Sequence, residues 1–213
     1  MTAKNTFKTN LDNIHKKLTE VSDWMYDNPE LGFEEFKTSQ YLVEFIESFD
    51  HDVTYPTGKL DTAFEITFGT EGPLTVLCVE YDALPEIGHA CGHNIIATAS
   101  IGAGLAIANL VEELGIRVKL LGTPAEEGGG GKIILLDNGV FEDAACSMMI
   151  HPAYENVVNP TFTTIQQYKV EFFGKDAHAA GAPEEGINAL DAQIQLFVNA
   201  STYRQQMVSS NRM

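Results

Sequence analysis

The feature that most constrains the fold of this sequence is a succession of short apolar runs in its middle part. Residues 74–79 (LTVLCV) form an apolar run of the kind expected of a strand covered on both faces. The pattern then continues as a buried helix, a strand, a short helix and a third buried strand, at residues 95–111, 116–121, 132–138 and 145–150. Strand, helix, strand, helix, strand predicts a doubly wound α/β domain with a mostly parallel sheet.

Patterns on either side of this core predict two helices before it and a change of style after it. Apolar residues recur at helical spacing from Leu11 to Met25, and 34–49 gives a second helix. Residues 63–68 alternate as a half-exposed strand does. After Pro160, residues 163–173 alternate again and 186–207 form an amphipathic helical pattern. We therefore expect a catalytic domain over residues 1–159 and part of a smaller α+β domain over 160–213.

The charge of the chain limits its partners. Thirty acidic residues against 13 basic ones give a formal net charge of -17, which argues against nucleic acids and anionic membrane surfaces as ligands. Residues 95–111 are interrupted by small and polar residues, so we expect a buried helix there and no membrane span. The start of the chain lacks the pattern of a signal peptide, and three scattered cysteines suggest no disulfide framework. We expect a cytoplasmic protein with Cys78 and Cys146 in its core.

Residues able to bind a metal follow each of the three buried strands, at the edge where a parallel sheet binds ligands. They are Glu80 and Asp82 with the loop 88–94 (GHACGHN), then Glu126 and Glu127, and finally His151. Cys91 and His93 can both face one ion, and Glu127 and His151 are the natural additions from neighbouring strands. Thiolate, imidazole and carboxylate ligands together favour zinc, with manganese or cobalt as alternatives.

The adjacent carboxylates Glu126 and Glu127 suit two different tasks. One can bind the metal, while the other takes a proton from a water that the metal activates and passes it to the leaving amine. Two other interpretations fit less well. A phosphate-binding loop fails because Ile133 follows Gly131-Lys132 and glutamate stands at position 126. A cysteine nucleophile at Cys91 leaves both glutamates and His151 without a role.

These motifs resemble the amidohydrolase branch of the aminoacylase and carboxypeptidase metallopeptidase superfamily, which includes hippurate, auxin-conjugate and aminobenzoyl-glutamate hydrolases and related dipeptidases. The matching segments are 28–35 (NPELGFEE), 80–85 (EYDALP), 88–94, 124–131 (PAEEGGGG), His151-Pro152 and 174–180 (GKDAHAA). The resemblance implies two divalent ions per complete site, ligands Cys91, His93, Glu127 and His151, and Glu126 as the acid/base. It implies hydrolysis of an amide or peptide bond in an N-acyl-amino acid or dipeptide.

The same resemblance implies further roles. Asp82 orients a ligand, whereas Glu80 stands where wider relatives carry a metal-binding histidine, and its role stays open. His178 belongs to a lid domain and reaches the active site of the other subunit of a homodimer. Relatives are nearly twice as long, with a further ligand histidine near their C-terminus, so we expect the 213-residue chain to be incomplete. The alternative function is a catalytically inactive metal-binding or dimerisation fragment.

Overall fold

The computed structural model describes residues 2–158 and 160–213. The chain divides into two compact units, Met1–Tyr154 and Glu155–Met213. The boundary predicted from the sequence falls at Asn159, which lies outside the described residues. All residues predicted to bind metal belong to the first unit, whereas His178 belongs to the second.

The first unit is built on a mixed four-stranded sheet in the order β1-β3-β2-β4. Its strands are β1 (Glu65–Phe68), β2 (Leu74–Val79), β3 (Arg117–Gly122) and β4 (Ala144–Met148). Strand β2 pairs in parallel with both β3 and β4, while β1 runs antiparallel to β3. The carboxyl ends of β2, β3 and β4 therefore meet at one edge, as the predicted parallel arrangement requires.

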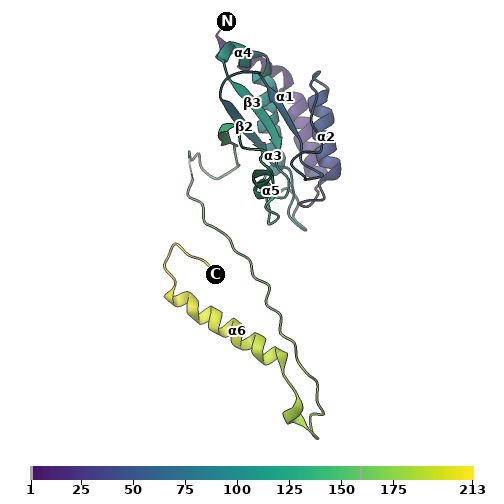
Figure 1. Ribbon diagram of the computed structural model, residues 1–213, viewed down its shortest axis with the longest axis vertical. Coiled ribbons are helices and arrows are strands. Elements are labelled where there is room, and N and C mark those ends of the chain that lie inside the picture. The colour runs from purple at the N-terminus through teal and green to yellow at the C-terminus, as the bar shows by residue number, and fades with distance from the viewer. Residues whose placement is uncertain (1, 159) are drawn as a thin grey trace. The chain divides into compact units, whose positions relative to one another are not determined.

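One face of the sheet is covered by the long helices. These are α1 (Ala3–Asp27), α2 (Phe36–Glu47) and α3 (His93–Ile107), which Figure 1 shows around strands β2 and β3. Because side chains alternate along a strand, Val79 of β2 and Val118 and Leu120 of β3 enter this core. They pack there with Met25 of α1 and other buried side chains. Both predicted N-terminal helices are confirmed.

The opposite face holds a second, smaller core. The intervening positions of β2, Leu74, Val76 and Cys78, pack there with Leu121 of β3 and Leu135 of the short helix α5 (Gly131–Asp137). Burial on both faces explains why β2 reads as an apolar run in the sequence. The sheet thus has helices on both faces, and the predicted burial of Cys78 is confirmed.

Helix α3 lies close to the sheet because its residues are small. A Cβ added at Gly104 would lie 2.6 Å from the side chain of Leu120, so only glycine permits this approach. A 3-10 turn (Ala108–Leu110) and α4 (Val111–Leu114) continue the helix to Gly115, whose φ of 63° ends it as predicted. Residues His93–Leu114 are long and apolar enough to cross a membrane, but most of this segment is buried in the core.

Two predictions about the later strands were wrong. Strand β4 forms as expected, but most of its residues, including Cys146, are exposed. It pairs with β2 alone, and no other described strand covers its second edge. The alternating stretch 163–173 forms no strand, because no described segment pairs with it to complete the backbone hydrogen bonds. An apolar run predicts a strand's existence, whereas its covering depends on other segments.

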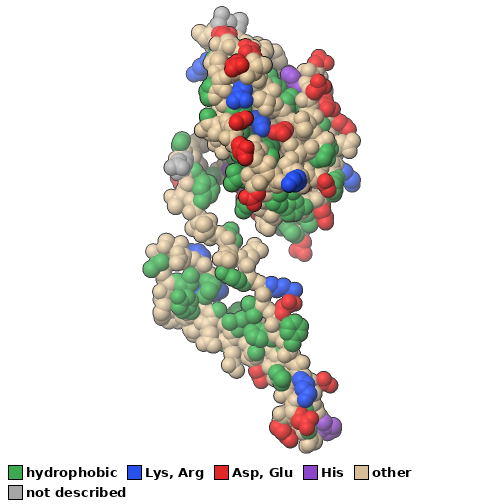
Figure 2. Space-filling model, viewed as in Figure 1, with side chains coloured by type: hydrophobic (Ala, Val, Ile, Leu, Met, Phe, Trp, Pro, Cys, Tyr) green, Lys and Arg blue, Asp and Glu red, His purple; other side chains and the backbone are tan. Residues whose placement is uncertain are grey.

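The second unit contains helix α6 (Ala189–Tyr203), within the predicted helical range. Asn188 begins the helix by accepting hydrogen bonds from the backbone N–H groups of Leu190 and Asp191. The apolar side chains of α6 are exposed, and Figure 2 shows green apolar atoms gathered on this unit. The same view shows acidic side chains spread over the first unit, in keeping with the net charge.

Candidate active site

The carboxyl end of β2 delivers the first two acidic side chains. Glu80 and Asp82 follow Val79 directly, and both are buried, at 0% and 1% exposure. The loop that follows ends at Gly92, whose φ of 80° starts α3 with His93 as its first residue. A Cβ at position 92 would lie 2.9 Å from Pro152, so glycine here also lets the β4 end approach the start of α3. The His93 ring, 1% exposed, lies beside Glu80 and Asp82.

Asp82 fixes the orientation of His93. Its Oδ1 lies 3.0 Å from His93 Nδ1, and its Oδ2 accepts a hydrogen bond of 2.9 Å from the backbone N–H of Glu127. Burial acts to raise the pKa of Asp82, but these hydrogen bonds outweigh burial and hold the pKa below its usual value. Asp82 is therefore an acceptor that binds Nδ1–H and leaves His93 Nε2 as the free ring nitrogen.

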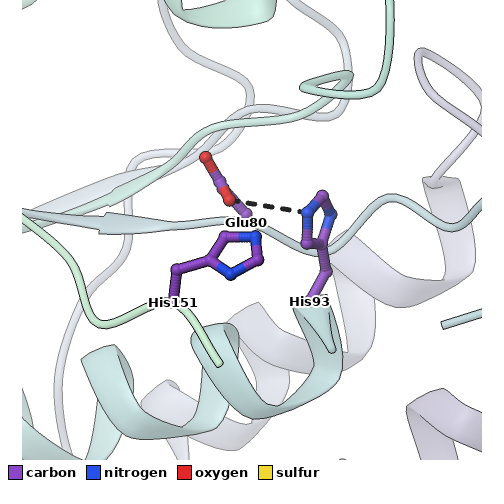
Figure 3. A group of neighbouring side chains, drawn as sticks. All are labelled: Glu80, His93 and His151. Carbon is purple, nitrogen blue, oxygen red and sulfur yellow. Dashed lines mark ion pairs between the residues drawn. The ribbon is translucent and has the colours of Figure 1, made fainter. Parts of the chain in front are cut away.

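His93 Nε2 faces Glu80 and His151, as Figure 3 shows. It lies 3.6 Å from Glu80 Oε2, and one ligand atom from each of the three residues lies within 4.8 Å of the others. His151, although exposed, has its Nδ1 2.8 Å from the carbonyl oxygen of Pro152, which leaves Nε2 free there too. A histidine that binds metal commonly donates its other ring N–H to a carboxylate or carbonyl in this way.

The end of β3 brings the glutamate pair to the same point. Glu126 Oε2 and Glu127 Oε1 lie 3.9 Å and 3.8 Å from His93 Nε2, and the three groups form a second set with ligand atoms within 4.8 Å. Burial, followed by the charge of Glu80, raises the pKa of Glu126 above its usual value. His93 thus lies between two groups of potential ligands, one containing Glu80 and His151 and the other the glutamate pair.

Glu35 supports the turn that aims this pair. It is fully buried, and its Oε1 accepts a hydrogen bond of 2.8 Å from the backbone N–H of Ala125, the residue before Glu126. Ala125 has a φ of 56°, a conformation that residues with a Cβ rarely adopt. The hydroxyl of Thr62 donates to the other oxygen of Glu35 at 3.0 Å. The sequence motif 28–35 contains Glu35, but its role was missed because its partners are distant in sequence.

Cys91 lies beside the site without belonging to either group of ligand atoms. Its thiol contacts the Glu127 carboxylate, and this hydrogen bond, with partial burial, raises the pKa of Cys91 to about 11. A thiol with this pKa is protonated near neutral pH, which disfavours the cysteine-nucleophile alternative for the metal-free protein. A bound metal ion would change this, because a coordinating thiol loses its proton.

The donor set fits a divalent metal ion. Glu80 Oε2 and His93 Nε2 are buried and have no hydrogen-bond partner among the described residues. Buried polar atoms normally find a partner, so two that face each other require an explanation. Imidazole nitrogens with carboxylate oxygens, and a thiol at the edge, are the ligands that zinc, manganese and cobalt accept.

Comparison with known proteins agrees with this chemistry. Residues 76–210, which contain every candidate site residue, match the family model described as peptidase family M20/M25/M40. The chain belongs to the M20/M25/M40 peptidase family. It is 38% identical to the Xaa-Arg dipeptidase of Mus musculus over 92% of this chain and 49% of that protein. It is 32% identical to a p-aminobenzoyl-glutamate hydrolase of Escherichia coli over 92% of this chain and 45% of that protein.

Solved structures of similar fold extend the M20 comparison. A putative aminohydrolase from methicillin-resistant Staphylococcus aureus has a TM-score of 0.68 at 22% identity, over 96% of this chain and 58% of that one. A dinuclear metal-binding M20 peptidase from Bacillus subtilis has a TM-score of 0.58 at 24% identity, over 64% and 42%. The chain spans about half the length of the curated M20 relatives that it matches.

Within this M20 site, the structure brings together most of the residues that the sequence suggested. Each of the following has a place beside His93 or on a residue that contacts it: Asp82, Glu126, Glu127, His151 and Cys91. Glu80, left without a role, joins the group. His178, in the second unit, is exposed, and its Nδ1 accepts a hydrogen bond of 2.9 Å from the backbone N–H of Gly181.

Proposed function

We propose that this chain provides the metal-binding part of an amidohydrolase that cleaves an amide or peptide bond in an N-acyl-amino acid or a dipeptide. Membership of the M20/M25/M40 family supports a hydrolase, and the names of the relatives supply the substrate classes. The observation that carries the proposal is the pair of buried, unpartnered atoms on Glu80 and His93, with a glutamate pair beside them.

The proposed ligands are Cys91, His93, Glu127 and His151, which would hold up to two divalent ions, zinc or else manganese or cobalt. When bound, such an ion supplies Lewis acidity and lowers the pKa of a coordinated water from about 15.7 towards about 7. Asp82 holds the ring of His93 and the backbone of Glu127 at once, so it positions two ligands through one carboxylate.

Glu126 is the proposed general acid/base. It lies beside His93 but is 42% exposed, so it is reachable from solvent and by a substrate. Burial and the charge of Glu80 raise its pKa, which makes it a better proton acceptor than an ordinary carboxylate. After taking a proton from the attacking water, it can return that proton to the nitrogen of the departing amine.

The second unit is proposed to be part of a lid that also forms a homodimer. Its helix α6 exposes several large apolar side chains, including Leu190, Ile194 and Phe197. Burial of such a face against a second subunit would be favourable. His178 is exposed on this unit, where it can act on the scissile carbonyl of a substrate held in the other subunit.

Substitution of each glutamate separates the proposed base from the proposed ligand. In the longest available form of the protein, Glu126→Gln should retain metal after dialysis yet lose about 10²- to 10⁴-fold in turnover, the range of general acid–base assistance. Glu127→Gln should lose metal as well. Elemental analysis and an assay with N-acyl-amino acids and dipeptides measure both. The exposed Glu142→Gln, on the same unit, serves as the control.

Two results would contradict this proposal. Absence of bound zinc, manganese or cobalt under metal-replete conditions would exclude a metallohydrolase. Reversed behaviour of the two glutamate variants would exchange the roles of Glu126 and Glu127. The alternative, an inactive metal-binding or dimerisation fragment, predicts that the 213-residue chain binds metal and stays inactive when a longer form is active.

A further inference from the structure

Glu80 forms an ion pair with Lys132 that the proposed hydrolysis does not require. Its carboxylate is fully buried at the end of β2, and Lys132 Nζ, on the second residue of α5, contacts its Oε1. The Lys132 side chain is 34% exposed, so the ammonium reaches inward from the surface. The other oxygen, Oε2, has no partner among the described residues and points toward His93.

Glu80 and His93 are held in the same manner. Each is buried and has one atom bound by the protein, His93 Nδ1 by Asp82 and Glu80 Oε1 by Lys132. Each has a second atom without a partner, and these two atoms, Nε2 and Oε2, lie 3.6 Å apart. Two ligand atoms about 2.1 Å from one tetrahedral ion lie about 3.4 Å apart. The separation therefore suits a shared ion, whereas it is too long for a hydrogen bond.

The charges around this point are unbalanced without a cation. Four carboxylates, those of Glu80, Asp82, Glu126 and Glu127, lie near His93, and Lys132 is the ammonium that contacts one of them. An unpaired charge at the buried Glu80 would be strongly unfavourable. Lys132 removes that penalty in the protein without metal.

We infer that Glu80 is a metal ligand and that Lys132 is its built-in counter-cation. The ion pair keeps the Glu80 carboxylate charged and in place before metal arrives, and it lowers the affinity of that position for a divalent ion. The inference rests on the proposed function, because it concerns the same metal site. It assigns two residues, Glu80 and Lys132, to the control of how tightly the site holds its ion.

Opposite effects of two substitutions test this assignment. Glu80→Gln removes the ligand charge, so zinc affinity should fall by about 10- to 100-fold, while Lys132→Met leaves Glu80 unpaired and should raise zinc affinity by a similar factor. Lys132→Met should also lower the unfolding midpoint without metal and enlarge the shift that zinc produces. Zinc affinity is measured by competition with a chromophoric chelator, and unfolding by fluorescence of Trp24, the single tryptophan.

The pair formed by Lys119 and Glu65 provides matched controls. It joins the same two residue types on the same sheet, with Nζ 2.7 Å from Oε2, and contacts none of the proposed ligands. Lys119→Met and Glu65→Gln should leave zinc affinity unchanged. Lys132→Arg, which keeps the positive charge, should remain close to the original protein.

The outcomes separate this inference from the proposed function. If Glu80→Gln keeps its zinc affinity while His93→Ala loses zinc, the metal site stands and Glu80 is no ligand. If Lys132→Met binds zinc more weakly, Lys132 is no counter-cation. If Lys132→Met does not fold, the double variant Glu80→Gln/Lys132→Met, which leaves no unpaired charge, should fold and bind zinc as Glu80→Gln does. Tighter binding by the double variant would refute the inference, whereas no zinc in the unaltered protein would refute the proposed function.

Discussion

Replacement of Glu35 gives a prediction whose size and pH dependence both follow from its contacts. Glu35→Leu removes the acceptor of two buried donors, the N–H of Ala125 and the hydroxyl of Thr62, which are 0% and 1% exposed. Each buried donor left without a partner costs about 1–3 kcal/mol, so the free energy of unfolding should fall by about 2–6 kcal/mol. Glu35→Gln keeps an acceptor for Ala125 and should change stability far less.

The pH dependence isolates the carboxylate itself. Burial raises the pKa of Glu35 above its usual value of 4.5. Below pH 4.5 the group is protonated in both the folded and the unfolded chain, and its contribution to stability is fully present. As the pH rises, the unfolded chain ionises first, so this contribution decreases until the pH passes the raised pKa of the folded state. The original protein should therefore lose stability relative to Glu35→Gln as the pH increases from 4.5.

Urea unfolding followed by Trp24 fluorescence measures these differences, because Trp24 lies in the same unit as Glu35. The neighbouring, exposed Glu34→Gln is the control and should stay within about 0.5 kcal/mol of the original protein at every pH. A constant difference between the original protein and Glu35→Gln from pH 4 to pH 8 would refute the reasoning about burial. A loss below about 1 kcal/mol in Glu35→Leu would show that the two donors find other partners.

Two further predictions concern how the site is assembled. Gly92→Ala should destabilise the first unit by about 1–2 kcal/mol, because φ is 80° there. Its new Cβ would also lie 2.9 Å from Pro152 and displace His151, so zinc retention should fall in the chelator assay, whereas Gly128→Ala, which meets no atom within 4 Å, should retain zinc. His178→Ala should abolish amide hydrolysis by a longer, active form of the protein but leave its metal content unchanged. Mixing it with Glu126→Gln should restore part of the activity if His178 acts across a dimer, and the absence of any recovery would exclude that role.

The sequence by itself determined the elements of the first unit and the edge at which its chemistry gathers. Local patterns were sufficient here, because β2 is buried on both faces and reads as an apolar run over the same residues, Leu74–Val79. Gly115, with its positive φ, likewise marked the end of the helical segment. Metal-binding residue types directly after parallel strands must lie at one edge, so proximity of His93, Glu127 and His151 followed from chain order alone.

The tertiary structure decided the partners of individual atoms. Glu35 contacts Ala125 across 90 positions of sequence, and Lys132 reaches Glu80 across 52, separations that no local pattern encodes. The exposure of β4 and the missing strand at 163–173 also lay beyond the sequence, because covering a strand depends on which segments pack against it. Side-chain periodicity records which way a residue faces, whereas the group it meets is fixed only when distant segments pack together.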